Sequence, residues 1–140
     1  MPGYVEKVCA KLWHSPPHFP QHAPHRWTQP SYRSKVQMAP VVTSPLLDAK
    51  GKKKVQSVTG SMLYYAHALD YTMLPVINEI SSQQSNPTEN TWKACEMLLD
   101  YALTYLAAKC RFYASNMCLH VDTDAAYLLQ PNACSRVFLS

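Results

Sequence analysis

Two aspartates near the C-terminal end of the sequence, Asp122 and Asp124, are the residues whose spacing first suggests chemistry. They follow Leu119 and Val121, which alternate with polar residues as in a strand with one apolar face. Paired carboxylates just past a strand can bind a hard cation such as Mg²⁺. A two-metal site needs several converging carboxylates, and the sequence has no obvious others. The spacing alone therefore favours an ordinary surface turn over a metal site.

Four histidines, His14, His18, His22 and His25, recur every three or four residues. On a helix this spacing would stack possible metal ligands along one face. Prolines lie between the histidines, so a helix is not expected there. No cysteine or carboxylate stands at zinc-ligand spacing, and metal binding has little support. The sequence also lacks a glycine-rich phosphate loop and a recognisable nucleophile motif.

A cluster of lysines, Lys50, Lys52, Lys53 and Lys54, is the best candidate for contact with nucleic acid. The net charge is +4, which permits binding to phosphates but does not demand it. The alternative is a solvated helix start, and the short length of the cluster favours that interpretation.

Apolar periodicity predicts the elements that must position these residues. We expect helices over residues 4–13, 52–69, 73–81 and 86–109, the last one capped by Asn86 with Pro87 in its first position. Gly60 interrupts the second helix, which costs stability unless another helix packs close to it. Residues 15–46 are rich in proline and histidine and are expected to be largely irregular. Short apolar runs predict strands at residues 110–114, 118–122 and 137–139.

The five cysteines are scattered and odd in number, no CxxC pair occurs, and the sequence does not start with a long apolar run. This usage predicts reduced thiols in a cytoplasmic or nuclear protein. No apolar stretch approaches the roughly 20 residues that span a bilayer, so we expect a soluble protein with no membrane partner.

The order of several short motifs resembles the Pol polyprotein of copia-type LTR retrotransposons. Residues 1–7 (MPGYVEK) resemble the segment that enters the thumb after the reverse transcriptase palm. Residues 20–27 (PQHAPHRW) and 44–51 (SPLLDAKG) are similar to the connector that follows in one branch of these elements. Each motif alone is unspecific, whereas their common order along the chain is specific.

The resemblance continues through the second half of the sequence. Residues 55–66 (VQSVTGSMLYYA) resemble the family's Q-x-x-x-G-S-L-L-Y-Y-A-R helix, and residues 72–74 (TML) follow it as in the family. Residues 98–102 (LLDYA) resemble a later helix end. Residues 113–128 (YASNMCLHVDTDAAYL) are similar to the opening of the ribonuclease H domain.

The resemblance implies an α+β fold: a helical thumb- and connection-like part followed by a truncated antiparallel ribonuclease H-like sheet. Its divisions are a thumb-like helix (1–14), a connector (15–50), a helical connection region (51–109) and the truncated start of a ribonuclease H-like domain (110–140). Asp124 matches the family's first metal-binding aspartate, whereas Asp122 stands where another residue is usual. Asp124 would thus be a vestigial catalytic carboxylate and Mg²⁺ ligand.

The chain also departs from the family pattern. The palm aspartates of the polymerase and the remaining nuclease carboxylates would lie outside residues 1–140. After Ser135 and Arg136, a glycine pair is missing before Val137, which alters the expected strand register. We therefore expect a transposable-element fragment that does not bind Mg²⁺ stably and is inactive alone. In the parent, its partners would be an RNA–DNA hybrid and the rest of the polyprotein. The alternative is a retained helical module that binds protein or nucleic acid without catalysis.

Overall fold

The computed structural model describes residues 2–26, 43–111, 113–114, 116–118, 123–130 and 134–139. They fall into two compact units. The larger unit contains the described residues up to 26 and from 44 to 111, and it is helical. The smaller unit contains Thr43 and the described residues that follow 111, including one pair of strands.

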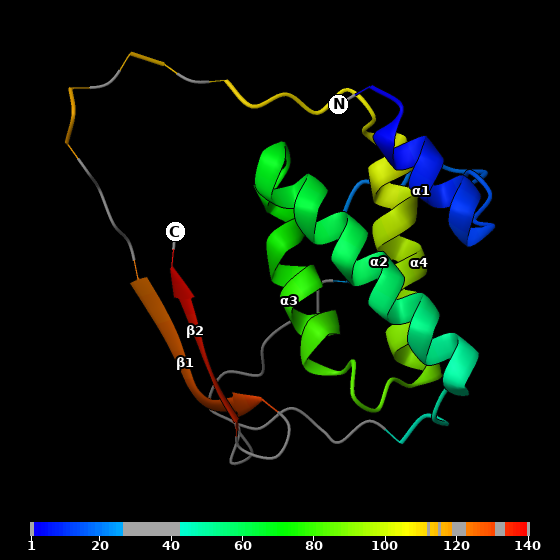
Figure 1. The fold of residues 1–140 in the computed structure, drawn as a ribbon. Helices are drawn as coiled ribbons and strands as arrows, with labels where there is room; N and C mark the ends of the chain where they lie inside the picture. The colour runs from blue at the N-terminus through cyan, green and yellow to red at the C-terminus, as the bar shows by residue number, and fades with distance from the viewer. Residues whose placement is uncertain are drawn as a thin grey trace. The chain divides into compact units, whose positions relative to one another are not determined.

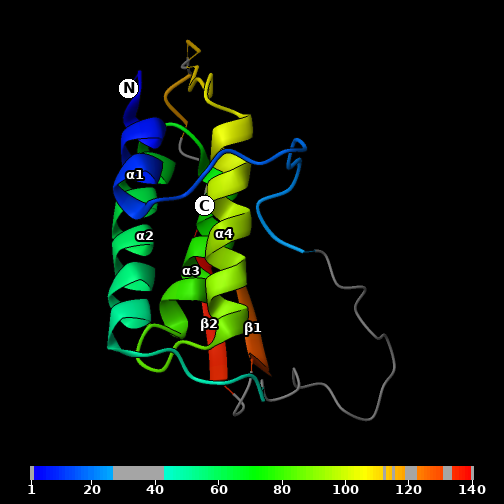
Figure 2. The same ribbon diagram turned by 90° about the vertical axis from the view of Figure 1, so that its right-hand side faces the viewer.

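Four α-helices and one 3-10 turn build the helical unit (Figure 1). Their bounds are α1 Tyr4–Leu12, α2 Ala49–Ala68, η1 Tyr71–Met73, α3 Leu74–Ser82 and α4 Glu89–Thr104. Helix α2 contacts α1, α3 and α4, and α4 also contacts α1 and α3. Figure 2 shows α1, α2 and α4 from the side, with α2 and α4 running in the same direction.

Helix α1 is short, and the residues at both of its ends adopt a left-handed backbone. Gly3 precedes it at φ 72°, a conformation that glycine adopts without steric cost. Trp13 ends it at φ 56°, and the amide groups of Trp13 and His14 donate to the carbonyls of Ala10 and Cys9. An isolated helix of this length is marginal in water, so its stability comes from burying one face against α2 and α4.

The segments just before α2 and α4 pair with each other. The amide of Leu47 donates to the carbonyl of Pro87 over 2.9 Å, and the amide of Glu89 donates to that of Pro45 over 3.0 Å. This extended pairing keeps residues 86–88 out of the helix. The prediction that Asn86 caps the helix is therefore wrong: Thr88 is the cap, and it forms a reciprocal capping box with Thr91.

One apolar core joins all four helices. Its most deeply buried large side chains come from α2, η1, α3 and α4: Tyr65, Met62, Met73, Ile77, Leu98, Leu99, Val55, Val58 and Cys95. Helix α1 adds Val5, Cys9 and Leu12. Burial of this kind stabilises by about 1.5–3 kcal/mol for each large side chain, against the entropy of ordering the chain.

Gly60 lies in the middle of α2, where we expected either close packing or a loss of stability. A Cβ placed on Gly60 meets no atom within 4 Å, and the residue is exposed. Among the described residues, no neighbouring helix requires a glycine at this point. Gly60 therefore only weakens α2.

The smaller unit contains two strands, β1 Thr123–Gln130 and β2 Cys134–Leu139, which pair antiparallel. Thr123 lies opposite Leu139 and Asp124 opposite Phe138, and the register shifts between Ala126 and Gln130.

The predicted fold class is wrong, because the described structure is dominated by four helices and forms no truncated ribonuclease H-like sheet. The described residues among 110–118 contain no strand, and residues 119–122 lie outside the described residues. The sequence prediction rested on short apolar alternation. Such a run becomes a strand only where a partner supplies its hydrogen bonds.

Candidate functional site

The predicted metal ligand Asp124 lies in β1, at the register position opposite Phe138. Asp122 lies outside the described residues. Within the described part of the chain, no group of three or more histidine, cysteine or carboxylate side chains could hold a metal ion.

The four predicted lysines lie in the first turns of α2 but do not share one face. At about 100° per residue, a run of this spacing spreads around most of the helix. The ammonium group of Lys52 donates to the carbonyl of Ser85 over 2.7 Å, and that of Lys54 lies 5.7 Å from the centre of the Trp92 ring. Lys50 and Lys53 are exposed. Lys52 and Lys54 therefore both contact other residues of the helical unit.

Helix polarity adds to the positive charge at this end of the unit. The N-terminal ends of α2 and α4 lie together here, and each carries a positive partial charge. Asp48 caps α2 by accepting a hydrogen bond of 2.7 Å from the amide of Gly51, and Glu89 lies in the first turn of α4. The chemistry available here is non-specific contact with an anionic backbone, centred on Lys50 and Lys53.

The four histidines do not converge on a common point. The imidazole Nε2 of His14 lies 2.7 Å from Oδ1 of Asp100, and Nδ1 of His22 lies 2.7 Å from the hydroxyl of Tyr105. His18 and His25 are exposed. His14 and His22 instead attach the irregular segment to α4, which is a structural role that sequence spacing did not reveal.

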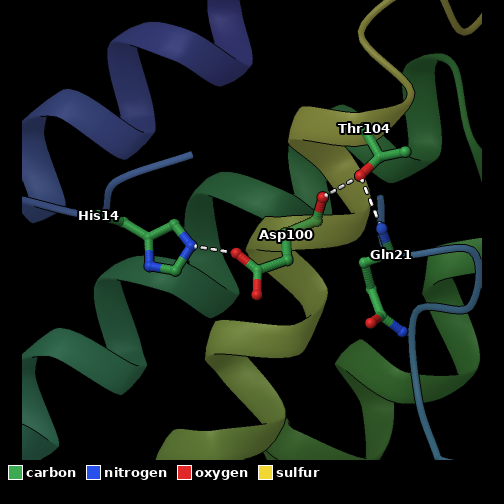
Figure 3. A network of polar contacts seen from close by, with 4 residues as sticks. All are labelled: His14, Gln21, Asp100 and Thr104. Carbon is green, nitrogen blue, oxygen red and sulfur yellow. Dashed lines mark hydrogen bonds and ion pairs between the residues drawn. The ribbon is translucent and has the colours of Figure 1, made fainter. Parts of the chain in front are cut away.

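We call residues 14–22 the connector strap, because they lie along the C-terminal half of α4. Figure 3 shows its network: His14 on the carboxylate of Asp100, and Gln21 on Thr104. The amide of Gln21 donates to Oγ1 of Thr104 over 3.0 Å, and that hydroxyl donates to the backbone carbonyl of Asp100 over 2.8 Å. The strap contains no helix or strand and is held by these side chains.

A hollow of about 380 Å³ lies where α2 and α4 end, and we call it the C-terminal hollow. It is partly open to solvent. Its lining consists of Leu69, Asp70, Tyr101, Thr104, Tyr105, Ala107, Ala108 and Lys109. The strap reaches its edge, since Gln21 and His22 contact two of these residues, Thr104 and Tyr105.

The negative charge of Asp70 acts on the hydroxyl of Tyr65. Burial raises the pKa of the Tyr65 hydroxyl, and the neighbouring charge of Asp70 raises it further. Both effects disfavour the tyrosinate anion. Asp70 is thus close enough to Tyr65 for its charge to act on that hydroxyl.

The two core cysteines, Cys9 and Cys95, have raised pKa values. Burial, with smaller contributions from Asp100 and Glu6, raises the pKa of Cys9 from 9.0 to about 11. Burial, and then the charge of Glu96, raises the pKa of Cys95 from 9.0 to about 12. Because the thiolate is the reactive form, neither residue is a candidate nucleophile.

Sequence reasoning missed the C-terminal hollow. The available signal was the spacing of Tyr101 and Tyr105, which are four residues apart and therefore neighbours on a helix surface. Their ring centres lie 5.0 Å apart in the structure. Nothing in the local sequence indicated that Asp70 would reach the same place.

Comparison with known proteins gives no identification: no family model, no curated protein and no solved structure matches the chain. Among the described residues, no helix has the length and apolar character needed to cross a membrane.

Proposed function

We propose that this chain is a segment of a copia-type retrotransposon Pol polyprotein, drawn from the helical region between the polymerase and the nuclease. In the parent protein that region would serve RNA-directed DNA synthesis and cleavage of the RNA–DNA hybrid. The support is the colinear order of the motifs. The structure adds that motifs far apart in the sequence pack into one core.

The observation that carries the proposal is the contact between the first motif and the helix motif. The hydroxyl of Tyr4 donates a hydrogen bond of 3.1 Å to the carbonyl of Ser61, 57 residues away. The ring of Tyr4 also stacks on that of Tyr65, with centres 6.0 Å apart and planes 3° apart. Residues 4–7 of the first motif and residues 55–66 thus pack in one core.

Two of the other motifs join the same core. Met73 in the 72–74 motif is fully buried, and so are Leu98 and Leu99 in the 98–102 motif. Several of the side chains that hold the helical unit together therefore lie in motifs that resemble the family. This favours a retained structural region over a chance run of similar letters.

We expect no polymerase or nuclease activity from these 140 residues alone. Asp124 is the single residue that matches a nuclease carboxylate, and a two-metal site needs several. The test is incubation of the purified protein with an RNA–DNA hybrid and Mg²⁺, with Asp124→Asn as the matched variant. Robust cleavage that Asp124→Asn abolishes would contradict this part of the proposal.

Descent from the polyprotein has its own test. Residues 2–111 would replace the corresponding segment of an active copia-type polyprotein, and DNA synthesis would be measured. We expect the chimera to retain activity, whereas the same chimera with Leu98→Asp should lose it through a disrupted core. A chimera as inactive as its Leu98→Asp control would argue against the proposal.

A second candidate is a small interaction module without catalysis, and the single core favours it. The helical unit buries apolar side chains from all four helices in one core. If residues 2–111 unfold in one cooperative thermal transition, the fragment can act as an independent binding module. Aggregation, or a thermal unfolding curve without a cooperative transition, would instead favour a remnant that needs the rest of the polyprotein.

A further inference from the structure

The C-terminal hollow lies at the negative ends of two helices. Because α2 and α4 begin side by side and run in the same direction, they also end at the same side of the unit (Figure 1). Leu69 and Asp70 follow α2, and Thr104 and Tyr105 end α4; all four line the hollow. A helix C-terminus carries a partial negative charge of about half an electron. Two such ends together favour a cation.

Two aromatic rings line the same hollow. Tyr101 and Tyr105 are tilted by 47° with their centres 5.0 Å apart. Their hydroxyls are engaged: that of Tyr101 lies 3.0 Å from Oγ1 of Thr72, and that of Tyr105 lies 2.7 Å from Nδ1 of His22. These bonds position the rings, whose negative faces attract cations, above all those with alkyl groups on nitrogen.

Asp70 adds a full negative charge to the lining. Its carboxylate accepts a hydrogen bond from the backbone amide of Thr72 over 3.1 Å and another from the Thr72 hydroxyl. These bonds fix the carboxylate in place without neutralising it. Lys109 is the one basic side chain among the residues that line the hollow.

We propose that the C-terminal hollow binds a small organic ammonium ion, held by the rings of Tyr101 and Tyr105 and the carboxylate of Asp70. The volume of about 380 Å³ is at the small end of ligand sites, which suits a compact cation. An anion would meet two negative helix ends and a carboxylate. A neutral molecule of the same shape would gain the apolar contact but none of the electrostatic attraction.

Lys109 shares the hollow with the bound cation, and its charge opposes binding. Replacing Lys109 by methionine keeps a long side chain but removes the like charge. Choline affinity should therefore rise about threefold in Lys109→Met, the size expected for a single partly exposed charge.

The test is a titration of the full chain followed by NMR of tyrosine ring signals, assigned through single Tyr→Phe variants. The probes are choline and its neutral isostere 3,3-dimethyl-1-butanol. We expect choline to shift the signals of Tyr101 and Tyr105 and to bind at least about threefold more tightly than the isostere, as a cation–π contact of moderate strength requires.

Two variants with matched controls locate the site. Asp70→Asn keeps an oxygen that can accept from Thr72 and should weaken choline binding about threefold, whereas Asp48→Asn at the other end of the unit should not. Tyr105→Leu removes a lining ring and should also weaken binding, whereas Tyr64→Leu on the exposed face of α2 should not. Equal affinity for choline and the isostere would overturn the proposal. So would an unchanged affinity in Asp70→Asn or Lys109→Met, or ring shifts confined to other tyrosines.

Discussion

The imidazole Nε2 of His14 lies 2.7 Å from the carboxylate Oδ1 of Asp100, a residue 86 positions later. The two side chains are 14% and 29% exposed, so the contact is partly shielded from water. It stands at the point where α1 has ended and the connector strap begins. The pair therefore ties three parts of the helical unit together: α1, the strap and α4.

We expect this contact to stabilise the fold measurably. His14→Ala and Asp100→Ala should each lower the free energy of unfolding by about 1–2 kcal/mol, because each leaves a partly buried polar group without its partner. The double variant should lose about 1 kcal/mol less than the sum of the two single variants. Urea denaturation of the four proteins measures both quantities.

A nearby histidine supplies the control for that cycle. His18 lies in the same strap but is exposed. His18→Ala should change the free energy of unfolding by less than about 0.5 kcal/mol. Strict additivity of His14→Ala and Asp100→Ala would show that the contact contributes nothing in solution.

Gly60 offers a substitution that should strengthen the fold. A Cβ at this position meets no atom within 4 Å, and the backbone is already helical. Gly60→Ala should therefore raise the free energy of unfolding by about 1 kcal/mol, through helix propensity and the lower entropy of the unfolded chain. Urea denaturation checks this: the midpoint should rise, while the slope of the free energy of unfolding against urea concentration should stay the same. A lower midpoint would mean that Gly60 has a packing role.

The helices could be predicted from the sequence because their apolar stripes are long enough to show a period of 3.6 residues. Val55, Val58, Met62 and Tyr65 are spaced three or four apart, and all four are buried. The helix ends were less predictable. Asn86 and Pro87 look like a local helix start, but pairing with residues 45–47 holds this segment extended, and Thr88 becomes the cap.

The predicted strand at residues 110–114, whose described residues form no strand, illustrates a different limit. Alternation over five residues fits a strand only if another strand pairs with it, and pairing is a long-range property. The candidate sites show the same limit. Asp70 and Tyr101 are 31 positions apart, and only the parallel course of α2 and α4 brings both to the C-terminal hollow.

Burial should divide the described cysteines into two reactivity classes. The raised pKa values, about 11 for Cys9 and about 12 for Cys95, keep both thiols protonated at pH 8. Cys118 is exposed. Iodoacetamide at pH 8 should therefore modify Cys118 rapidly and the two core thiols only on unfolding, as peptide mass mapping with and without urea would show. Rapid labelling of Cys95 in the folded protein would mean that the core opens readily.

The unequal lysines of α2 give a test of residual nucleic-acid contact. Lys52 and Lys54 contact Ser85 and Trp92, although Lys54 is exposed; Lys50 and Lys53 are exposed as well. If the chain binds an RNA–DNA hybrid, each free lysine that reaches a phosphate adds about one unit to the slope of log affinity against log salt. Lys53→Gln should reduce that slope by about one unit, and Lys52→Gln should reduce it less.

The measurement is a filter-binding or fluorescence titration with a short RNA–DNA hybrid at several salt concentrations. Lys52→Gln is the matched control, because it removes the same charge from the same turn of α2 but from a side chain held by Ser85. Equal slopes for the wild type and Lys53→Gln would show that Lys53 contacts no phosphate. Binding that does not respond to salt would rule out a phosphate interaction altogether, because displaced counterions make every such interaction weaken as salt rises.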